Sequence, residues 1–401
     1  MNTSIFHQKL EEINKIIDQQ EYEESTIGVL SGLSGIALFK FYYSKFLDKD
    51  NNDIGSILLE QSIQKINEGY NLGTFCSGIA GMGWVISHLE RNGFIDIDLD
   101  NLFGELDQYL FKKMKNDLEK GHYDFLHGGL GYAFYFLNRY KNTNSQLLKE
   151  NYKTCLLAAI EILEKRSESN DKTYKWISEI GLNTKEKGYN LGLSHGMSSI
   201  VGMLTKLSPH KDFEKVSKKM LRGTISYILQ YQNPNKEGSC LFPNIIHENG
   251  SHEYKSRLAW CYGDLGIGIR FWHAAKVLQD ASLLKTAIKI MEHAALRTNN
   301  EQTMIKDAGL CHGSFGNAQI FLRMYKETNN NTFKDACEFW MQDGLNKATH
   351  IDGYAGYKQW KGPNEWKKEV SLLEGVAGIG LTLIDYLADF ETSWDECLMI
   401  S

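Results

Sequence analysis

The chain has 401 residues, of which 42% are hydrophobic and 23% are charged, so it is long enough to bury a large core. Its formal net charge is −6, with lysine and arginine interspersed among the acidic residues, which argues against a nucleic-acid-binding protein because such a protein needs a basic face. The seven cysteines are odd in number and widely scattered, unlike the disulfide framework of a small secreted domain.

The first twenty residues have the pattern of a polar helix. Glu11, Glu12 and Asp18 lie where a signal peptide would need an apolar core, so we expect a cytoplasmic protein. No run approaches the about 18 apolar residues of a membrane-spanning helix. With only four prolines and no Ser/Pro-rich linker, the sequence predicts an all-α protein that forms a single domain over residues 1–401.

A short glycine-centred motif, usually followed by an apolar run, recurs seven times along the chain. Six of the seven copies keep a second glycine three residues on, and the fourth copy has Ser199 there. The intervals between the aligned glycines are 46, 50, 68, 67, 50 and 62 residues. These glycines are Gly32, Gly78, Gly128, Gly196, Gly263, Gly313 and Gly375.

Each motif leads into a segment that is apolar on nearly every side, such as residues 132–137, which is typical of a fully buried helix. Amphipathic segments such as residues 148–163 and 284–295 lie between the motifs and have the period of surface helices. Seven pairs of one buried and one half-buried helix can close into a ring, so we predict a seven-fold α/α toroid. The glycines would let chain segments approach closely at the rim where the inner helices begin. A phosphate-binding turn is disfavoured because no strand precedes the motifs.

The variable positions of the motif are the candidate functional positions. Two residues before the aligned glycine stand Leu30, Cys76, Leu126, Ser194, Cys261, Cys311 and Leu373. One residue before it stand Ser31, Ser77, His127, His195, Tyr262, His312 and Glu374.

Repeats five and six therefore place Cys261, Cys311 and His312 at equivalent positions on neighbouring turns. Two thiolates and an imidazole suit Zn²⁺, and three protein ligands leave a fourth position open. The alternative is that these are buried small side chains beside a satisfied histidine.

Trp260-Cys-Tyr-Gly263 and Leu310-Cys-His-Gly313 resemble the paired zinc-ligand motifs of the lanthionine synthetase C-like family, the lanthipeptide cyclases. The resemblance extends to Tyr123-Asp124, Ser194-His-Gly196 and Ser256-Arg-Leu-Ala-Trp260, and it covers essentially the whole chain. It implies a seven-fold α/α barrel with zinc at the mouth of its cavity. The implied zinc ligands are Cys261, Cys311 and His312, and the implied catalytic residues around them are Asp124, His195, Arg257 and Tyr262.

The reaction that the resemblance implies is a Michael-type addition of a peptide cysteine to dehydroalanine or dehydrobutyrine, which closes a thioether ring of lanthionine or methyllanthionine. His195 would move the proton, and Asp124 would orient its imidazole. Arg257 would neutralise the developing oxyanion or hold Asp124, unless it only makes a salt bridge. Tyr262 would hydrogen-bond into the site, unless it only packs.

The implied partners are a precursor peptide of ribosomal origin, a separate dehydratase that dehydrates it, and an export transporter, with a place beside a membrane-bound biosynthetic complex. A second possibility is an enzyme that adds a small thiol such as glutathione to electrophiles. A third is a non-catalytic zinc-containing scaffold that binds peptides. A toroidal glycosidase or terpenoid cyclase is disfavoured, because only Asp124, Asp264 and Glu374 offer carboxylates near the rim.

Three further features lie near the predicted site. Cys76 occupies the ligand column of repeat two, three repeats away from repeat five, and we interpret it as a buried thiol. His127 lies near Asp124, and we interpret it as structural rather than catalytic. Residues 243–250 have a strand-and-turn pattern and lead to Arg257, so we expect this segment to overhang the site and contact peptide.

Overall fold

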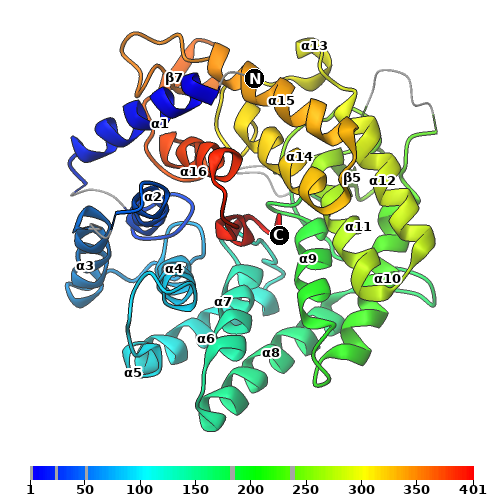
Figure 1. The fold of residues 1–401 in the computed structure, drawn as a ribbon. Helices are drawn as coiled ribbons and strands as arrows, with labels where there is room; N and C mark the ends of the chain where they lie inside the picture. The colour runs from blue at the N-terminus through cyan, green and yellow to red at the C-terminus, as the bar shows by residue number, and fades with distance from the viewer. Residues whose placement is uncertain (1–2, 23–25, 50–52, 181–185, 235–239) are drawn as a thin grey trace. The chain divides into compact units, whose positions relative to one another are not determined.

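The computed structural model describes residues 3–22, 26–49, 53–180, 186–234 and 240–401 (Figure 1). The chain forms two compact units, one from residues 1–97 and 305–401 and the other from residues 98–304. The two units are called unit 1 and unit 2 below. The expectation of a single domain over the whole chain stays a prediction.

All seven inner helices begin where the repeat predicts. The residue that caps the N-terminus of each is the aligned glycine of its motif. The inner helices are α2 (Leu33–Phe46), α4 (Ile79–Arg91), α7 (Gly129–Asn142), α9 (Met197–Leu207), α11 (Asp264–Leu278), α14 (Ser314–Thr328) and α16 (Val376–Leu387). They are buried along most of their length, as apolar character on every side predicts.

The remaining helices are mostly amphipathic and pack outside the inner ones. They are α1 (Thr3–Asp18), α3 (Asp53–Asn67), α5 (Leu99–Leu102), α6 (Gly104–Glu119), α8 (Gln146–Arg166), α10 (Glu214–Leu229), α12 (Ala281–Ala295), α13 (Asn300–Thr303) and α15 (Asn331–Asn346). The predicted face of α8 is buried at all its core positions except Leu148, which is half-buried. On α12 the predicted face is confirmed at Ala287, Met291 and Ala295, which are buried, but not at Leu284 and Ile288, which are half-buried. Leu283 and Ile290 are buried in addition.

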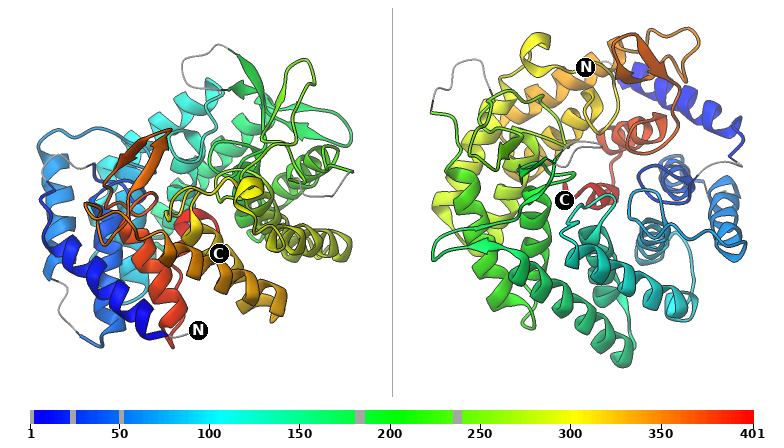
Figure 2. Two further views of the ribbon diagram at one scale, coloured as in Figure 1. Left: turned by 90° about the horizontal axis from the view of Figure 1, so that it is seen from above. Right: turned by 180° about the vertical axis from the view of Figure 1, so that it is seen from behind.

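In unit 2 the inner helix α9 contacts both α7 and α11, and each inner helix also packs against the outer helix that follows it, α8, α10 or α12. In unit 1 the inner helix α16 contacts both α14 and α2, and α2 contacts α4. The outer partner of α16 is α1, the first helix of the chain, which runs alongside it (Figure 2). The last repeat therefore packs directly on the first.

Backbone hydrogen bonds join the motif turns of successive repeats. The amide of Leu30 donates to the Cys76 carbonyl at 3.0 Å, and the amide of Leu373 donates to the Leu30 carbonyl at 2.8 Å. The second glycine of the motif lets the first turn of the inner helix pack closely on the backbone of its own motif turn. A Cβ on Gly316 would lie 1.9 Å from the Leu310 carbonyl oxygen, and one on Gly378 would lie 1.9 Å from that of Leu372. The glycine pattern is thus a packing requirement of the rim.

Seven short strands interrupt the helices in the part of the chain that the structure describes. They are β1 (Glu168–Ser169), β2 (Tyr174–Lys175), β3 (Ser178–Glu179), β4 (Lys187–Asn190), β5 (Ile245–His247), β6 (Gln359–Gly362) and β7 (Glu365–Lys367), and a 3₁₀ helix spans Trp394–Leu398. Strand β4 pairs antiparallel with β3 and β5, and β6 with β7 forms a hairpin. The strand-and-turn pattern expected at residues 243–250 is confirmed by β5 and the turn after it. Within the described residues, no helix is both long and apolar enough to cross a membrane.

Candidate functional site

An imidazole–carboxylate pair lies on the motif turns of unit 2. Nδ1 of His195, on the turn before α9, lies 2.5 Å from Oδ2 of Asp124, on the turn before α7. The other carboxylate oxygen, Oδ1, accepts hydrogen bonds from the backbone amides of Leu126 and His127 at 2.7 and 2.8 Å. The turn therefore fixes the carboxylate by one oxygen and presents the other to the histidine. With Nδ1 donating to Asp124, Nε2 is left to accept a proton.

Each member of this pair stabilises the charge of the other. Burial alone raises the pKa of Asp124, but the hydrogen bond and charge of His195 outweigh burial and bring the pKa below its usual range. Burial alone lowers the pKa of His195, but the hydrogen bond and charge of Asp124, with a contribution from Cys261, raise it above its usual range. An imidazole held in this way is suited to take up and return a proton.

Two aromatic rings flank His195 in unit 2. The Tyr262 ring lies 6.2 Å from the His195 ring, and its hydroxyl accepts a hydrogen bond from Nδ2 of Asn190 at 3.3 Å. The exposed His127 ring stacks on His195 at 6.1 Å with an interplanar angle of 17°. Sequence reasoning missed Asn190. The signal available was its place six residues before an aligned glycine, the same place that Arg257 holds in the next repeat.

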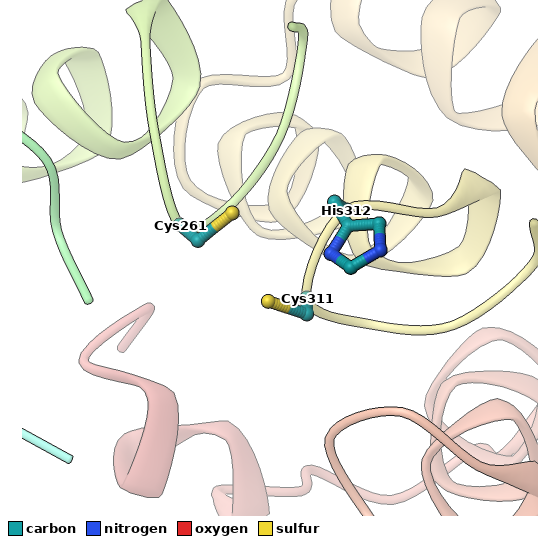
Figure 3. A group of neighbouring side chains, drawn as sticks. All are labelled: Cys261, Cys311 and His312. Atoms are coloured by element: carbon teal, nitrogen blue, oxygen red, sulfur yellow. The ribbon is translucent and has the colours of Figure 1, made fainter. Parts of the chain in front are cut away.

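Cys261 lies on the turn that leads into α11, where Figure 3 shows its side chain. Its thiol is buried, and its carbonyl accepts hydrogen bonds from the amides of Leu193 and Ser194 at 2.9 and 3.2 Å. Cys261 is therefore joined by its backbone to the turn that carries His195. Arg257 is half-buried at the start of the same segment, and its catalytic role stays a prediction.

A buried ion pair anchors the segment around Cys261. Oδ2 of Asp264, the first residue of α11, lies 3.0 Å from the Arg297 guanidinium, and both side chains are almost fully buried. Asp264 also accepts hydrogen bonds from the amides of Leu241 and Phe242. Arg297 donates in addition to the Ser256 carbonyl at 3.0 Å, beside Arg257. Asp264 is thus committed to structure, which weakens the glycosidase alternative. Arg297 lies outside the motifs, so sequence reasoning did not identify it.

Cys311 and His312 lie next to each other on the turn before α14 in unit 1 (Figure 3). The Cys311 thiol is buried, and its amide donates to the Leu373 carbonyl at 3.0 Å. Two carboxylates accompany the imidazole, because ligand atoms of Asp307, His312 and Glu374 all lie within 4.8 Å of one another. Sequence reasoning did not identify Asp307.

The donor set fits a zinc ion. Cys261 and Cys311 would supply soft sulfur ligands, and His312 would supply an imidazole with a carboxylate behind it, as zinc-binding histidines usually have. Cys261 belongs to unit 2, whereas Cys311 and His312 belong to unit 1. That the three bind one ion stays a prediction.

Cys76 has the surroundings of a structural thiol. It is buried in unit 1, and its Sγ lies 3.6 Å from Oγ of Ser31, which is itself 2.7 Å from Oγ of Ser77. In the alignment of the repeats, Cys76 stands at the position of Cys261 and Cys311. Ser31 and Ser77 stand at the position of His312.

Comparison with known proteins gives one consistent group. Residues 24–399 match the family model described as Lanthionine synthetase C-like protein. The chain is 22% identical to the Nisin biosynthesis protein NisC of Lactococcus lactis subsp. lactis over 413 aligned positions, covering 96% of this chain and 91% of that protein. It is 25% identical to Glutathione S-transferase LANCL1 of Danio rerio over 275 positions, covering 66% of this chain and 59% of that protein.

Among solved structures, the chain resembles one titled nisin cyclase with a TM-score of 0.73 and 21% identity, over 97% of each chain. This likeness shows the fold. The all-α fold class expected from the sequence, an α/α toroid built on seven repeats, is therefore confirmed.

Proposed function

This chain belongs to the lanthionine synthetase C-like family, and we propose that it is a lanthipeptide cyclase. In this proposal it adds a peptide cysteine to a dehydroalanine or dehydrobutyrine of the same peptide and so forms a lanthionine or methyllanthionine ring. The relatives named for nisin biosynthesis and nisin cyclisation support a peptide substrate. The observation that carries the proposal is the hydrogen-bonded pair of His195 and Asp124 on turns next to the one that bears Cys261.

In the same proposal Cys261, Cys311 and His312 hold a zinc ion. When bound, zinc supplies a positive charge that lowers the pKa of a coordinated thiol, so that the nucleophile is a thiolate at neutral pH. Two thiolate ligands keep the positive charge of the site low, which preserves the nucleophilicity of the attacking sulfur.

The residues around the ligands carry the proton. His195 accepts the proton of the substrate thiol at Nε2, while Nδ1 remains bonded to Asp124. The sulfur then forms a bond to the β-carbon of the dehydroamino acid, and the electron pair of the carbon–carbon double bond moves to form an enolate. His195 returns the proton to the α-carbon, so no atom is lost. Arg257 stabilises the enolate oxygen, and Tyr262 hydrogen-bonds into the same site.

The substrate must reach this site already dehydrated, because nothing in the proposed chemistry removes water from serine or threonine. A separate dehydratase is therefore the proposed upstream partner, and an exporter of the finished peptide is the proposed downstream one. We place the protein in the cytoplasm, at the periphery of such a membrane-bound complex. Residues 243–250, next to Arg257, are the proposed peptide-contacting segment.

The decisive experiment is mass spectrometry of a precursor peptide co-expressed with its dehydratase, with and without this chain. Cyclisation leaves the mass unchanged, so ring formation is read by loss of reactivity toward a thiol-alkylating reagent. We expect unreactive peptide only when the chain is present. Full alkylation in both samples would refute the proposal. A parallel incubation with glutathione and a dehydroalanine peptide distinguishes the small-thiol alternative, which the zebrafish relative's name raises.

A further inference from the structure

We propose that Asp307 is a positioning residue that holds the His312 ring with its Nε2 proton toward the carboxylate and so leaves Nδ1 to bind the metal. The inference rests on the proposed zinc site, but it concerns only residues of unit 1. It assigns a role to a residue that does not belong to the ligand set itself.

Asp307 is rigidly held and almost fully buried. The exposed fraction of Asp307 is 3%. Oδ1 accepts a hydrogen bond from the amide of Gly309 at 3.2 Å, and Oδ2 accepts one from the amide of Trp360, in β6, at 2.9 Å. The Asp307 carbonyl accepts from the amide and hydroxyl of Ser314, the first residue of α14. Both carboxylate oxygens and the carbonyl of Asp307 are therefore held by the motif turn, β6 and the start of α14.

Oδ2 of this fixed carboxylate lies 3.6 Å from Nε2 of His312. A small rotation of the imidazole brings the two atoms to hydrogen-bond distance, with Nε2–H as the donor. A neutral imidazole carries one ring proton, so a proton held at Nε2 leaves the lone pair on Nδ1. Carboxylates behind metal-binding histidines fix the tautomer and the ring orientation in this way.

The repeat provides an internal control for this role. Asp307 stands six residues before the aligned glycine of repeat six, and Glu369 stands at the same place in repeat seven. Oε1 of Glu369 accepts from the amide of Ser371 at 3.1 Å, two residues on, as Oδ1 of Asp307 does from Gly309. Both acids cap the same turn, and Asp307 in addition faces the metal-ligand candidate His312. Asp307 thus has a contact with Nε2 of His312 that turn capping alone does not require.

A second carboxylate, Glu374, lies in the same cluster as Asp307 and His312. We assign the role to Asp307 rather than to Glu374 because Asp307 is fixed by backbone amides from two separate segments, the motif turn and β6. A carboxylate with such restraints can hold a ring in one orientation.

The test uses Asp307→Asn, with Glu369→Gln as the matched control and Asp307→Glu as the conservative rescue. Asp307→Ser is a further variant, which keeps a turn-capping oxygen but removes Oδ2. Circular dichroism establishes that each variant is folded. Two measurements follow on the full chain: the rate at which a chromophoric chelator removes zinc, and nitrogen-15 NMR of labelled histidines in metal-free protein. The His312 signals are assigned from His312→Gln.

We expect wild-type His312 to show the Nε2–H tautomer without metal, and Asp307→Asn and Asp307→Ser to lose it. Zinc loss should be roughly 10–100-fold faster in both variants, close to wild type in Glu369→Gln and partly restored in Asp307→Glu. Wild-type tautomer and zinc release in Asp307→Asn and Asp307→Ser would overturn the inference, as would an Nδ1–H tautomer in the wild type. The same changes in Glu374→Gln but not in Asp307→Asn would also overturn it. A wild type that takes no zinc but shows the expected tautomer would refute the zinc proposal alone.

Discussion

The Nδ1 atom of His195 and the Oδ2 atom of Asp124 lie 2.5 Å apart, although 71 residues separate them along the chain. The short distance joins the turns of repeats three and four through side chains. Other adjoining turns are joined through backbone amides and carbonyls, as Leu193 is to Cys261, and the turns of repeats one and two also through the Ser31 and Ser77 hydroxyls. The contact between the turns of repeats three and four therefore depends on the protonation state of the His195 imidazole.

Replacing Asp124 by asparagine should lower the pKa of His195, because the hydrogen bond and charge that raise it are lost and burial, which lowers it, remains. If neutral His195 accepts the thiol proton, kcat/KM rises with pH through this pKa. In Asp124→Asn that rise should therefore move to lower pH, and the plateau should fall by roughly 10²–10⁴-fold because the imidazole is no longer held in the right tautomer. A pH–rate profile of ring closure measures both effects. A rise at unchanged pH would contradict the assignment.

The same pair predicts the pH dependence of stability. His195, whose folded pKa is raised, stabilises the fold fully below its unfolded value of about 6.5, and this contribution is lost as pH rises through the folded pKa. Asp124, whose folded pKa is lowered, contributes above its unfolded value of about 3.9, and its contribution is lost as pH falls through the folded pKa. The difference in unfolding free energy between wild type and Asp124→Asn should thus be greatest between about pH 4 and 6.5. Urea unfolding at several pH values checks this window.

The variant His195→Ala distinguishes two possible roles of His195, that of a proton carrier and that of a metal ligand. We expect the variant to retain zinc and peptide binding but to close rings roughly 10²–10⁴-fold more slowly, the usual contribution of a positioned acid–base group. The assay counts free thiols on dehydrated peptide over time, after subtraction of the uncatalysed reaction, beside zinc analysis of the same sample. Loss of zinc would make His195 a ligand instead, and an unchanged rate would remove it from the mechanism.

Cys261→Ala and Cys311→Ala should each lose metal and cyclisation while helix content stays nearly intact. The reason is that the helices are held by packing of their buried faces rather than by the ion. Elemental analysis of purified protein, together with far-ultraviolet circular dichroism, measures the two quantities. Active wild-type protein without zinc would refute the metal assignment.

Cys76→Ala serves as the matched cysteine control. The thiol is buried and contacts Ser31, so we expect a loss of about 1–2 kcal/mol in unfolding free energy with unchanged zinc content. Denaturant unfolding and elemental analysis on one preparation provide both values. If metal were lost on this substitution, the alignment of the repeats around the ring would be wrong.

Arg297→Ala should be strongly destabilising. Removal of the guanidinium leaves the fully buried Asp264 carboxylate without its cation, a change that typically costs about 3–5 kcal/mol. The matched control is Lys218→Ala, which breaks an exposed pair with Glu214 on α10 and should leave the denaturation midpoint unchanged. Equal midpoints for Arg297→Ala and wild type would show that the buried pair contributes nothing to stability.

The parts of the fold that recur were predictable from the sequence. The aligned glycines mark every inner-helix start, because a Cβ at these positions would meet atoms of the turn that leads into the helix. The amphipathic period located α8 and α12, although two positions expected to be buried on α12, Leu284 and Ile288, are half-buried. Two adjacent apolar positions on a helix cannot be ranked by period alone, because the packing of the neighbouring helix decides between them.

The supporting residues of the site were not predictable from the repeat. The contact between Asp307 and the amide of Trp360 spans 53 residues and involves a hairpin that is not part of any motif. Arg297 reaches Asp264 from a loop between repeats. Such contacts depend on segments that differ between repeats, so a comparison of repeats cannot reveal them. One further position of the repeat would have been informative. Asn190, Arg257 and Asp307 each lie six residues before the aligned glycine of their repeat, in repeats four, five and six.

The hydrogen bond from Leu373 to Leu30 means that unit 1 cannot be completed until the last part of the chain has been synthesised. Residues 98–304, which form unit 2, emerge from the ribosome as one continuous stretch. Helix α2 can pack on α3 and α4 early, but it must wait for α16, which is made more than 300 residues later. The surface of α2 that α16 covers is thus exposed for most of translation, at roughly 5–20 residues per second. That surface is therefore where we expect a chaperone to bind the nascent chain.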